Sequence, residues 1–186
     1  MKSKYPSSEV IHQDDYFRKE NDPMHVWINI QNSHRKHQNW EHQNCTDWNS
    51  LLQKVLSIIQ KKPENSEKTF LFIEGHIIFN NPDLVNLFHK KFFIDLEKEV
   101  MHKRRILRNY LPPDPEGYFD EWVWPQYLEN RKLLENQIDI GKQFKYNLNF
   151  IKITFLFFFL IVFIDGSQTI EAINQTIIDR LKIFQI

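Results

Sequence analysis

The sequence predicts an α/β domain with a parallel β-sheet, because strand-like and helix-like segments alternate along its 186 residues. Its continuous apolar runs are typical of strands buried on both faces of such a sheet. The clearest run is Thr69–Ile73, which stops at Glu74–Gly75. A hydrophobic content of 41% is ordinary for one globular domain with a sizeable core, so we expect residues 1–186 to form a single domain.

The N-terminal part contains one expected strand, one loop and one helix. Glu9–His12 is predicted as the end of a short strand that leads into a loop at Asp14–Asp15. Lys19–Cys45 is rich in His, Asn and Gln and has no sustained period, so we expect a long surface loop. Asp47–Lys61 has apolar residues at helical spacing behind Asp47, a suitable N-cap residue, and predicts a helix.

The alternation continues to the end of the chain. The predicted elements are a strand at Thr69–Ile73, a short helix at Asp83–Leu87, a strand at Lys91–Leu96, a helix at Glu97–Tyr110, a helix at Trp124–Ile138, a strand within the run IVFIDG at 161–166, and an amphipathic helix at Thr169–Ile183. We expect Pro112 and Pro113 to end the helix at Glu97–Tyr110, because proline has no backbone N–H to donate.

Charge and cysteine content exclude several classes of protein. The 24 basic residues balance the 24 acidic ones, which gives no reason to expect a nucleic-acid or anionic-membrane partner. The single cysteine, Cys45, excludes an internal disulfide framework and suits a reducing compartment. The apolar run Ile153–Ile164 holds about a dozen residues, short of the roughly 20 that a membrane-spanning helix needs, so no membrane partner is expected.

Three features of the chain are typical of phosphoryl-transfer enzymes. A carboxylate after one strand, Asp14, can accept a proton from an attacking hydroxyl group. A carboxylate after a second strand, Glu74, can hold Mg²⁺. Arginines on one helix, such as Arg104 and Arg105, can neutralise a transferring phosphoryl group. Each feature also has an ordinary explanation: a solvated turn at Asp14–Asp15, a simple strand end at Glu74, and a solvated helix face for the arginines.

Longer segments carry a specific resemblance. VIHQDDYF, FLFIEGHIIFN and above all KRRILRNYLPPDPEGYFDEWVWPQY resemble the nicotinamide riboside kinases, ATP-dependent enzymes of the P-loop nucleoside kinase class. The resemblance runs from about Tyr5 to Gln137 and resumes from about Ile161 to Leu181, and it is poor between Lys19 and Ser50. It implies a P-loop NTPase-type three-layer α/β domain, ATP as co-substrate, Mg²⁺ as cofactor and a cytoplasmic location. A uridine or pantothenate kinase is disfavoured by the pattern at Tyr110–Pro125.

The resemblance also implies residue roles. Asp14 is then the general base that deprotonates the ribose 5′-hydroxyl group, and Asp14 and Glu74 belong to the Mg²⁺ environment. Trp40 and Tyr110 are aromatic walls on the two sides of the nicotinamide, an arrangement that favours a cationic ring. Glu41 binds ribose hydroxyl groups. The full substrate-binding set is Asp14, Asp15, Tyr16, Phe17, Trp40, Glu41, Arg105, Tyr110, Leu111 and Asp114, and the ATP-binding set is Arg104, Arg108, Asn109, Tyr110, Gln168, Thr169 and Ile170.

Some positions depart from the family pattern. Glu41 replaces the usual aspartate, and Leu111 stands where a polar residue often touches the base, so base selectivity stays open. His76 replaces a usual apolar residue, and we expect no catalytic role for it.

A zinc site is the rival interpretation of part of this region. His34, His37, His42 and Cys45 have spacings that zinc could use, but they match no strong zinc pattern.

The phosphate-binding motif of the class is not found in these 186 residues. Nucleoside kinases of this class begin with a strand and the motif G-x-x-x-x-G-K-S/T, whose amides and lysine hold the phosphates. The four glycines are Gly75, Gly117, Gly141 and Gly166, and none begins such a motif. We therefore expect an N-terminally truncated kinase-like domain that by itself binds ATP poorly and is inert. The alternative function is an inactive product that at most binds nucleoside.

Residues 141–160 interrupt the resemblance. Their composition, GKQFKYNLNFIKITFLFFFL, is what AT-rich non-coding DNA encodes, and both ends resemble splice sites. We interpret this segment as a non-native insertion from a retained intron in a faulty gene model, with a true lineage-specific insertion or a hydrophobic anchor as the alternatives.

Overall fold

The computed structural model describes residues 5, 7–31, 33, 36–61, 70–147 and 161–182, with the backbone alone for residues 137–147. The chain divides into two compact units. One comprises Met1–Leu87 and Pro115–Val123, and the other comprises Phe88–Asp114 and Trp124–Ile186. Each unit contains a pair of parallel strands with helices in the same unit, which confirms the prediction of an α/β protein with parallel sheet structure.

The first unit is organised around strands β1, Glu9–His12, and β4, Leu71–Glu74. They pair in parallel, so that His12 lies opposite Glu74 at the carboxyl ends. Both strands were predicted, but β4 is half-buried rather than buried on both faces. Among the described residues β4 pairs with β1 alone, which leaves its other edge without a neighbouring strand.

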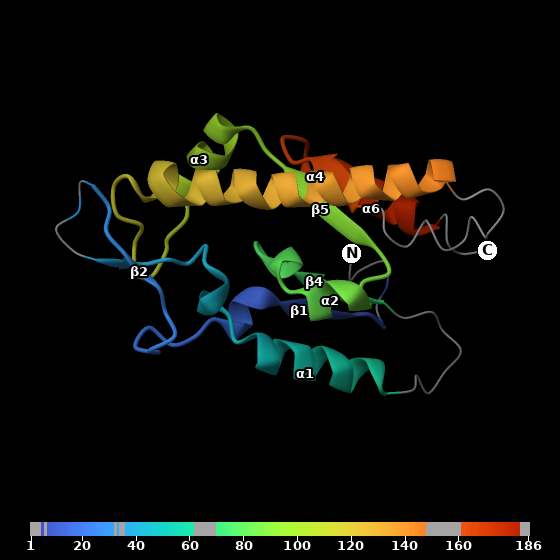
Figure 1. Ribbon diagram of the computed structural model, residues 1–186, viewed down its shortest axis with the longest axis horizontal. Helices are drawn as coiled ribbons and strands as arrows, with labels where there is room; N and C mark the ends of the chain where they lie inside the picture. The colour runs from blue at the N-terminus through green and yellow to red at the C-terminus, as the bar shows by residue number, and fades with distance from the viewer. Residues whose placement is uncertain are drawn as a thin grey trace. The chain divides into compact units, whose positions relative to one another are not determined.

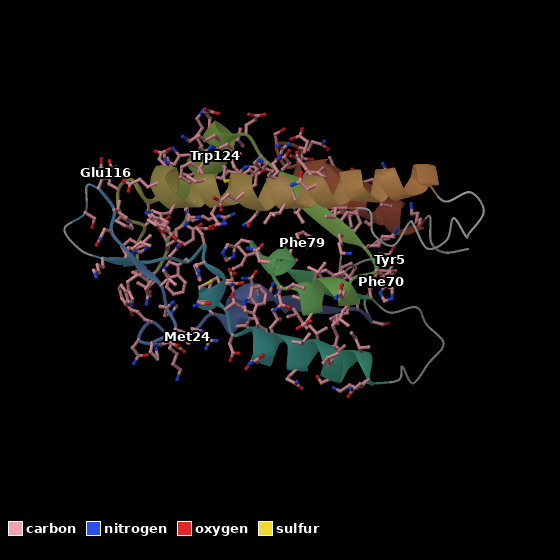
Figure 2. All side chains as sticks on the ribbon, in the orientation of Figure 1. Tyr5, Met24, Phe70, Phe79, Glu116 and Trp124 are labelled. Atoms are coloured by element: carbon pink, nitrogen blue, oxygen red, sulfur yellow. The ribbon has the colours of Figure 1, made fainter. Side chains whose placement is uncertain are left out.

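Helix α1, Trp48–Ile59, forms the apolar support of this unit. Its predicted N-cap is confirmed: the Asp47 carboxylate accepts a hydrogen bond from the backbone N–H of Ser50 at 3.2 Å. Leu51 and Val55, one helical turn apart, are fully buried, and each such burial is worth about 1.5–3 kcal/mol. The helix contacts the 3₁₀ turn η1, Gln13–Tyr16, which follows β1 (Figure 1). At the edge of the unit Tyr5 packs edge-on against Phe70, with ring centroids 4.7 Å apart (Figure 2).

The prediction of a surface loop at Lys19–Cys45 was wrong. The described part of this segment contains two short antiparallel strands, β2, Trp27–Ile28, and β3, His37–Gln38, and the 3₁₀ turn η2, Gln43–Cys45. Many of its side chains are buried. They are Ile28, Ile30, His25, His37, Gln38, Asn39, Glu41 and Cys45. Polar composition misled the prediction because polar groups here meet backbone partners, as where the Gln38 amide donates to the Glu20 carbonyl.

The rest of the first unit follows β4. The turn η3, Ile78–Asn80, leads into helix α2, Pro82–Leu87, which agrees with the predicted short helix and buries Leu84. The π-helical turn η4, Phe119–Val123, also belongs to this unit and was not predicted. It follows Tyr118, whose ring is fully buried.

The second unit contains strands β5, Lys91–Asp95, and β6, Ile161–Asp165, which pair in parallel over their whole length. Helix α6, Ile170–Lys182, packs on β6 and buries Ile178 and Leu181. All three elements were predicted. Helix α4, Trp124–Asn147, is longer than the predicted Trp124–Ile138.

A polar network joins α4 to the end of β5. The Asp95 carboxylate accepts hydrogen bonds from the Tyr127 hydroxyl and the Arg131 guanidinium, the latter with Nη2 at 3.0 Å. Burial, assisted by the bond to Asp95, raises the pKa of Tyr127 to about 12. Tyr127 therefore stays a hydroxyl donor to Asp95 at ordinary pH.

Helix α3, Lys98–Ile106, ends earlier than predicted. We expected it to continue to Tyr110 and to be stopped by Pro112 and Pro113. Instead it ends before both prolines, because the chain turns back and brings Asp114 to the Arg105 side chain. Leu107 is 82% exposed, so a longer helix would gain little apolar burial there.

Most of residues 141–160, the segment interpreted as a non-native insertion, lies outside the described residues. The backbone of helix α4 is described up to Asn147, whereas residues 148–160 are not described. Within the described part of the chain, no helix is both long and apolar enough to cross a bilayer.

Candidate active site

Two carboxylates predicted to act in catalysis lie beyond the carboxyl ends of paired strands. Glu74 is the last residue of β4, and Asp14 lies in η1, two residues after β1 ends. Both side chains are exposed. Because β1 and β4 are parallel and in register, the two acids follow the same edge of the strand pair.

His12 adds a contact that the sequence did not indicate. Its Nδ1 lies 2.6 Å from Glu74 Oε1. This hydrogen bond raises the pKa of His12 above its ordinary value, with Glu74, Asp15 and Asp14 adding attraction for the protonated ring. Both partners are more than half exposed, so the pair contributes little stability and Glu74 stays accessible.

The chemistry of Asp14 and Glu74 fits Mg²⁺. Carboxylate oxygens are the ligands that this ion prefers, and Mg²⁺ is commonly held by one or two carboxylates together with waters and substrate phosphates. Among the described residues, no group of three or more His, Cys, Asp or Glu side chains is arranged to hold a metal.

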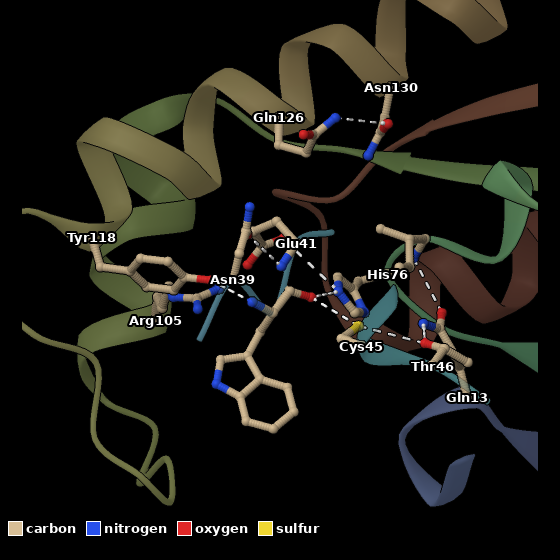
Figure 3. Close-up of polar contacts among 12 residues, drawn as sticks. Gln13, Asn39, Glu41, Cys45, Thr46, His76, Arg105, Tyr118, Gln126 and Asn130 are labelled. Atoms are coloured by element: carbon tan, nitrogen blue, oxygen red, sulfur yellow. Dashed lines mark hydrogen bonds and ion pairs between the residues drawn. The ribbon is translucent and has the colours of Figure 1, made fainter. Parts of the chain in front are cut away.

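A buried glutamine ties the two strand ends together. Gln13, fully buried, donates its amide N–H to Thr46 Oγ1 at 2.9 Å and accepts the backbone N–H of Ile77 at 3.1 Å (Figure 3). It sits directly before Asp14, and its second bond reaches the loop that follows Glu74. Gly75 leaves the room that Gln13 occupies, since a Cβ atom there would lie 2.2 Å from Gln13 Oε1. One side chain thus positions the segments that carry both acids.

The loop at Trp40 is held by side chains on both of its backbone polar groups. The Trp40 N–H donates to the Tyr118 hydroxyl at 3.0 Å. The Trp40 carbonyl accepts from His76 Nε2 at 2.9 Å and from Cys45 Sγ at 3.2 Å. Figure 3 shows Tyr118, Cys45 and His76 pointing into this network. The sequence predicted Trp40 as a site residue, but it did not indicate that Tyr118, Cys45 and His76 hold it.

Aromatic rings surround the Trp40 indole within the first unit. Phe17 lies 5.5 Å away between ring centroids, and His25 lies 5.1 Å away in an edge-on arrangement. The structure therefore brings together Phe17 and Trp40, two residues predicted to bind substrate from positions 23 apart in sequence.

Glu41 lies beside this aromatic cluster. Its side chain is buried, with Oε2 3.9 Å from His76 Nε2, and its backbone N–H donates to the Asn39 side chain at 3.1 Å.

A surface pocket of about 600 Å³ lies along η1. Its lining includes Asp15, Tyr16 and Phe17, which were predicted to bind substrate, together with Arg18 and Asp47. Trp40 and Glu41 are not part of its lining.

The zinc interpretation is not supported by the residues that the structure describes. His37 packs edge-on against Tyr118, His42 Nδ1 accepts the N–H of Asn44, and Cys45 donates to the Trp40 carbonyl. His34 lies outside the described residues. The three described side chains serve packing and turn geometry instead of a common ligand.

Cys45 is expected to resist thiol reagents. Burial raises the pKa of Cys45 to about 11, which lowers the thiolate fraction at pH 8 about 100-fold relative to an exposed cysteine. Reaction with a chromogenic disulfide reagent at pH 8 should therefore be at least about 100-fold slower in native than in urea-unfolded protein. A native rate within tenfold of the unfolded rate would contradict the buried S–H donor.

The second unit carries the predicted arginines. Arg105 Nε donates to Asp114 Oδ2 at 2.6 Å, and the guanidinium lies over the Tyr110 ring at 4.8 Å from its centroid. Arg105 thus contacts two other residues predicted to bind substrate, Asp114 and Tyr110. The cation lies in the last turn of α3 and is held by a charge-assisted bond.

Arg104 and Arg108 point to different partners. Arg104 Nη1 donates to the Gly166 carbonyl at 2.8 Å, which ties α3 to the turn after β6. Arg108 Nη1 donates to the Tyr110 hydroxyl at 3.3 Å. Asn109 and Leu111 are exposed on either side of Tyr110.

The predicted adenine contacts lie at the start of α6. Thr169 Oγ1 accepts the N–H of Ala172 at 3.2 Å, as an N-cap residue does. Gln168, Thr169 and Ile170 are exposed. Arg104 approaches this region through Gly166, so two of the predicted ATP-binding segments are joined within one unit.

The predicted site residues therefore form two sets. The first unit holds the acids Asp14 and Glu74 and the Phe17–Trp40–Glu41 cluster. The second unit holds the arginines, Tyr110, Asp114 and the start of α6. Each set is assembled within its own unit by the contacts described above.

Comparison with known proteins supplies the family. The chain is 32% identical over 190 residues to human nicotinamide riboside kinase 2, a match that covers 95% of this chain and 70% of the relative. It is 30% identical over 146 residues to rat nicotinamide riboside kinase 1, covering 71% and 69%, and 26% identical over 175 residues to the nicotinamide riboside kinase of Saccharomyces cerevisiae, covering 71% and 70%. No protein-family model matches. The extent of these matches shows that the chain belongs to the nicotinamide riboside kinase family.

Proposed function

We propose that this protein transfers the γ-phosphoryl group of ATP to the 5′-hydroxyl group of nicotinamide riboside, giving nicotinamide mononucleotide for NAD synthesis. The observation that carries the proposal is the first unit's combination of an exposed acid at a strand end, Asp14, with the Trp40–Glu41 pair. Family membership supports the same reaction, because each relative compared is named for the phosphorylation of this riboside.

Riboside recognition is assigned to aromatic and acidic side chains. The Trp40 indole offers a π face to the cationic nicotinamide ring, a contact worth about 0.5–2 kcal/mol depending on desolvation. The Glu41 carboxylate accepts hydrogen bonds from the ribose hydroxyl groups. Asp15, Tyr16 and Phe17 contribute from η1. The residues of the second unit that we assign to substrate binding are Tyr110, Arg105, Leu111 and Asp114.

The chemical step depends on positioning and charge. Asp14 accepts the proton of the 5′-hydroxyl group as the oxygen bonds to the γ-phosphorus, while the bond from this phosphorus to the β–γ bridging oxygen breaks and ADP leaves. Arg104 and Arg108 neutralise charge on the phosphates, and Gln168, Thr169, Ile170 and Asn109 contact the nucleotide. Asp14 and Glu74 would hold Mg²⁺, which when bound screens the phosphate charge.

The finer features of the fold remain part of this proposal. We assign the α/β architecture to the three-layer P-loop NTPase type. The 186 residues printed here contain no G-x-x-x-x-G-K-S/T motif.

Titration of purified protein with nicotinamide riboside tests the proposal. Calorimetry without ATP should show saturable binding of the riboside, and addition of millimolar ATP and Mg²⁺ should produce nicotinamide mononucleotide, measured by chromatography. Uridine at the same concentrations is the matched control and should bind more weakly, because its neutral base gains less from Trp40. Absence of riboside binding by folded protein would overturn the proposal.

The same titration also tests the alternative that the protein is inactive and only binds nucleoside. Riboside binding without any product at saturating ATP would favour a binding protein. The comparisons do not favour this alternative, since kinases match over most of the chain.

A further inference from the structure

We propose that His76 is a positioning residue of the riboside site, which sets the place of the Trp40 indole and the Glu41 carboxylate. The inference rests on the proposed function, since it concerns the residues assigned to the nicotinamide ring and the ribose. His76 itself touches no reacting atom in this assignment, and its role is exerted through Trp40 and Glu41.

The first observation is the hydrogen bond between His76 and the Trp40 backbone. His76 Nε2 lies 2.9 Å from the Trp40 carbonyl oxygen. A carbonyl can only accept, so Nε2 carries the hydrogen and donates it. Trp40 lies in a turn between β3 and η2, and its carbonyl accepts from two side chains, those of His76 and Cys45. Side-chain donors therefore decide where this residue sits.

The second observation is that the same nitrogen reaches the neighbouring acid. His76 Nε2 is 3.9 Å from Glu41 Oε2, and the Glu41 side chain is buried, with 10% of its surface exposed. One ring nitrogen thus lies near both the carbonyl oxygen of the Trp40–Glu41 peptide bond and the Glu41 carboxylate. This arrangement couples the direction of the indole to the direction of the carboxylate.

The third observation concerns the imidazole ring. It packs edge-on against Phe17 with ring centroids 5.8 Å apart, and Phe17 in turn lies 5.5 Å from Trp40. His76 follows Gly75 and Glu74 directly, so it extends from the end of β4 to the aromatic cluster. The rigid strand pair β1–β4 therefore supports a loop whose own secondary structure is slight.

Two substitutions separate the roles of the ring and the donor. His76→Phe keeps a ring against Phe17 but removes the N–H, whereas His76→Gln keeps an amide N–H at a similar reach without the ring. His76→Phe should weaken riboside binding about tenfold, the size expected for one lost positioning hydrogen bond. His76→Gln should restore binding to within about threefold of wild type. The ATP affinity should not change in either variant.

A readout without ligand makes the test independent of the proposed function. The indole N–H resonance of Trp40, assigned by comparison with Trp40→Phe, should move or broaden in His76→Phe and return near its wild-type position in His76→Gln. Failure of wild type to bind riboside, with this pattern intact, would overturn the proposed function and leave the positioning role standing. An unmoved Trp40 resonance in His76→Phe, or equal loss of riboside binding in both variants, would overturn the role assigned to the hydrogen bond.

Discussion

Asp14→Asn is expected to lower the rate of nicotinamide mononucleotide formation by about 10²–10⁴-fold, the usual contribution of a general base. Asparagine has the same shape as aspartate but an amide in place of the carboxylate, so it cannot take the proton of the 5′-hydroxyl group. Because Asp14 is exposed at the end of the strand pair, folding should be unaffected. The riboside dissociation constant, measured by calorimetry, should stay within about threefold of the wild-type value.

Glu9→Gln is the matched control for this experiment. Glu9 is an exposed acid at the start of β1, the strand that precedes Asp14, and its replacement should leave the rate unchanged. Raising the Mg²⁺ concentration distinguishes two roles of Asp14. Partial recovery of the Asn variant at high Mg²⁺ would indicate a metal ligand rather than a base, and a rate within tenfold of wild type at ordinary Mg²⁺ would contradict both roles.

Gly75→Ala is expected to destabilise the protein by about 2–4 kcal/mol. The added Cβ would lie 2.2 Å from Gln13 Oε1, 2.4 Å from Gln13 Cβ and 2.8 Å from Ile78 Cγ2, distances that no packed side chain tolerates. Gln13 is buried and holds the Ile77 N–H and the Thr46 hydroxyl, so its displacement breaks hydrogen bonds as well as packing. Urea unfolding should show a lower midpoint with an unchanged slope.

A double-mutant cycle checks the cause of this loss. Gln13→Ala alone should also destabilise, because the Ile77 N–H loses its acceptor. Combined with Gly75→Ala it should cost less than the sum of the two single changes, since the overlap with Gln13 Oε1 is gone while those with the Cβ of residue 13 and with Ile78 Cγ2 remain. Simple additivity would show that the alanine at position 75 does not act through the Gln13 amide.

Predictions from periodic segments agreed well with the structure. Glu9–His12, Lys91–Leu96 and the run at 161–166 are strands within a residue or two of the expected bounds, and Asp47 caps its helix as expected. In each of these segments the repeated placement of apolar residues records which face is buried. Residue types were sufficient to predict these elements because many residues contribute to the same hydrophobic pattern.

Predictions from composition failed. Lys19–Cys45 is polar and aperiodic, yet it contains two strands and several buried side chains. Some of its polar groups find backbone partners inside the fold, as the Gln38 amide does in the Glu20 carbonyl. The end of α3 was misplaced for a related reason. A single ion pair, Arg105 with Asp114, accompanies the reversal of the chain before the prolines that were expected to stop the helix.

The sequence by itself determined the α/β class, most strands and helices, the kinase resemblance and the identities of Asp14, Glu74, Trp40 and the arginines as candidates. Only the tertiary structure decided which side chains hold them, because Tyr118 and His76 meet Trp40 from positions 78 and 36 residues away. His12 meets Glu74 across 62 residues in the same way. Such contacts arise from the pairing of β1 with β4 and from loop packing, and one contact between distant residues leaves no periodic pattern in the chain.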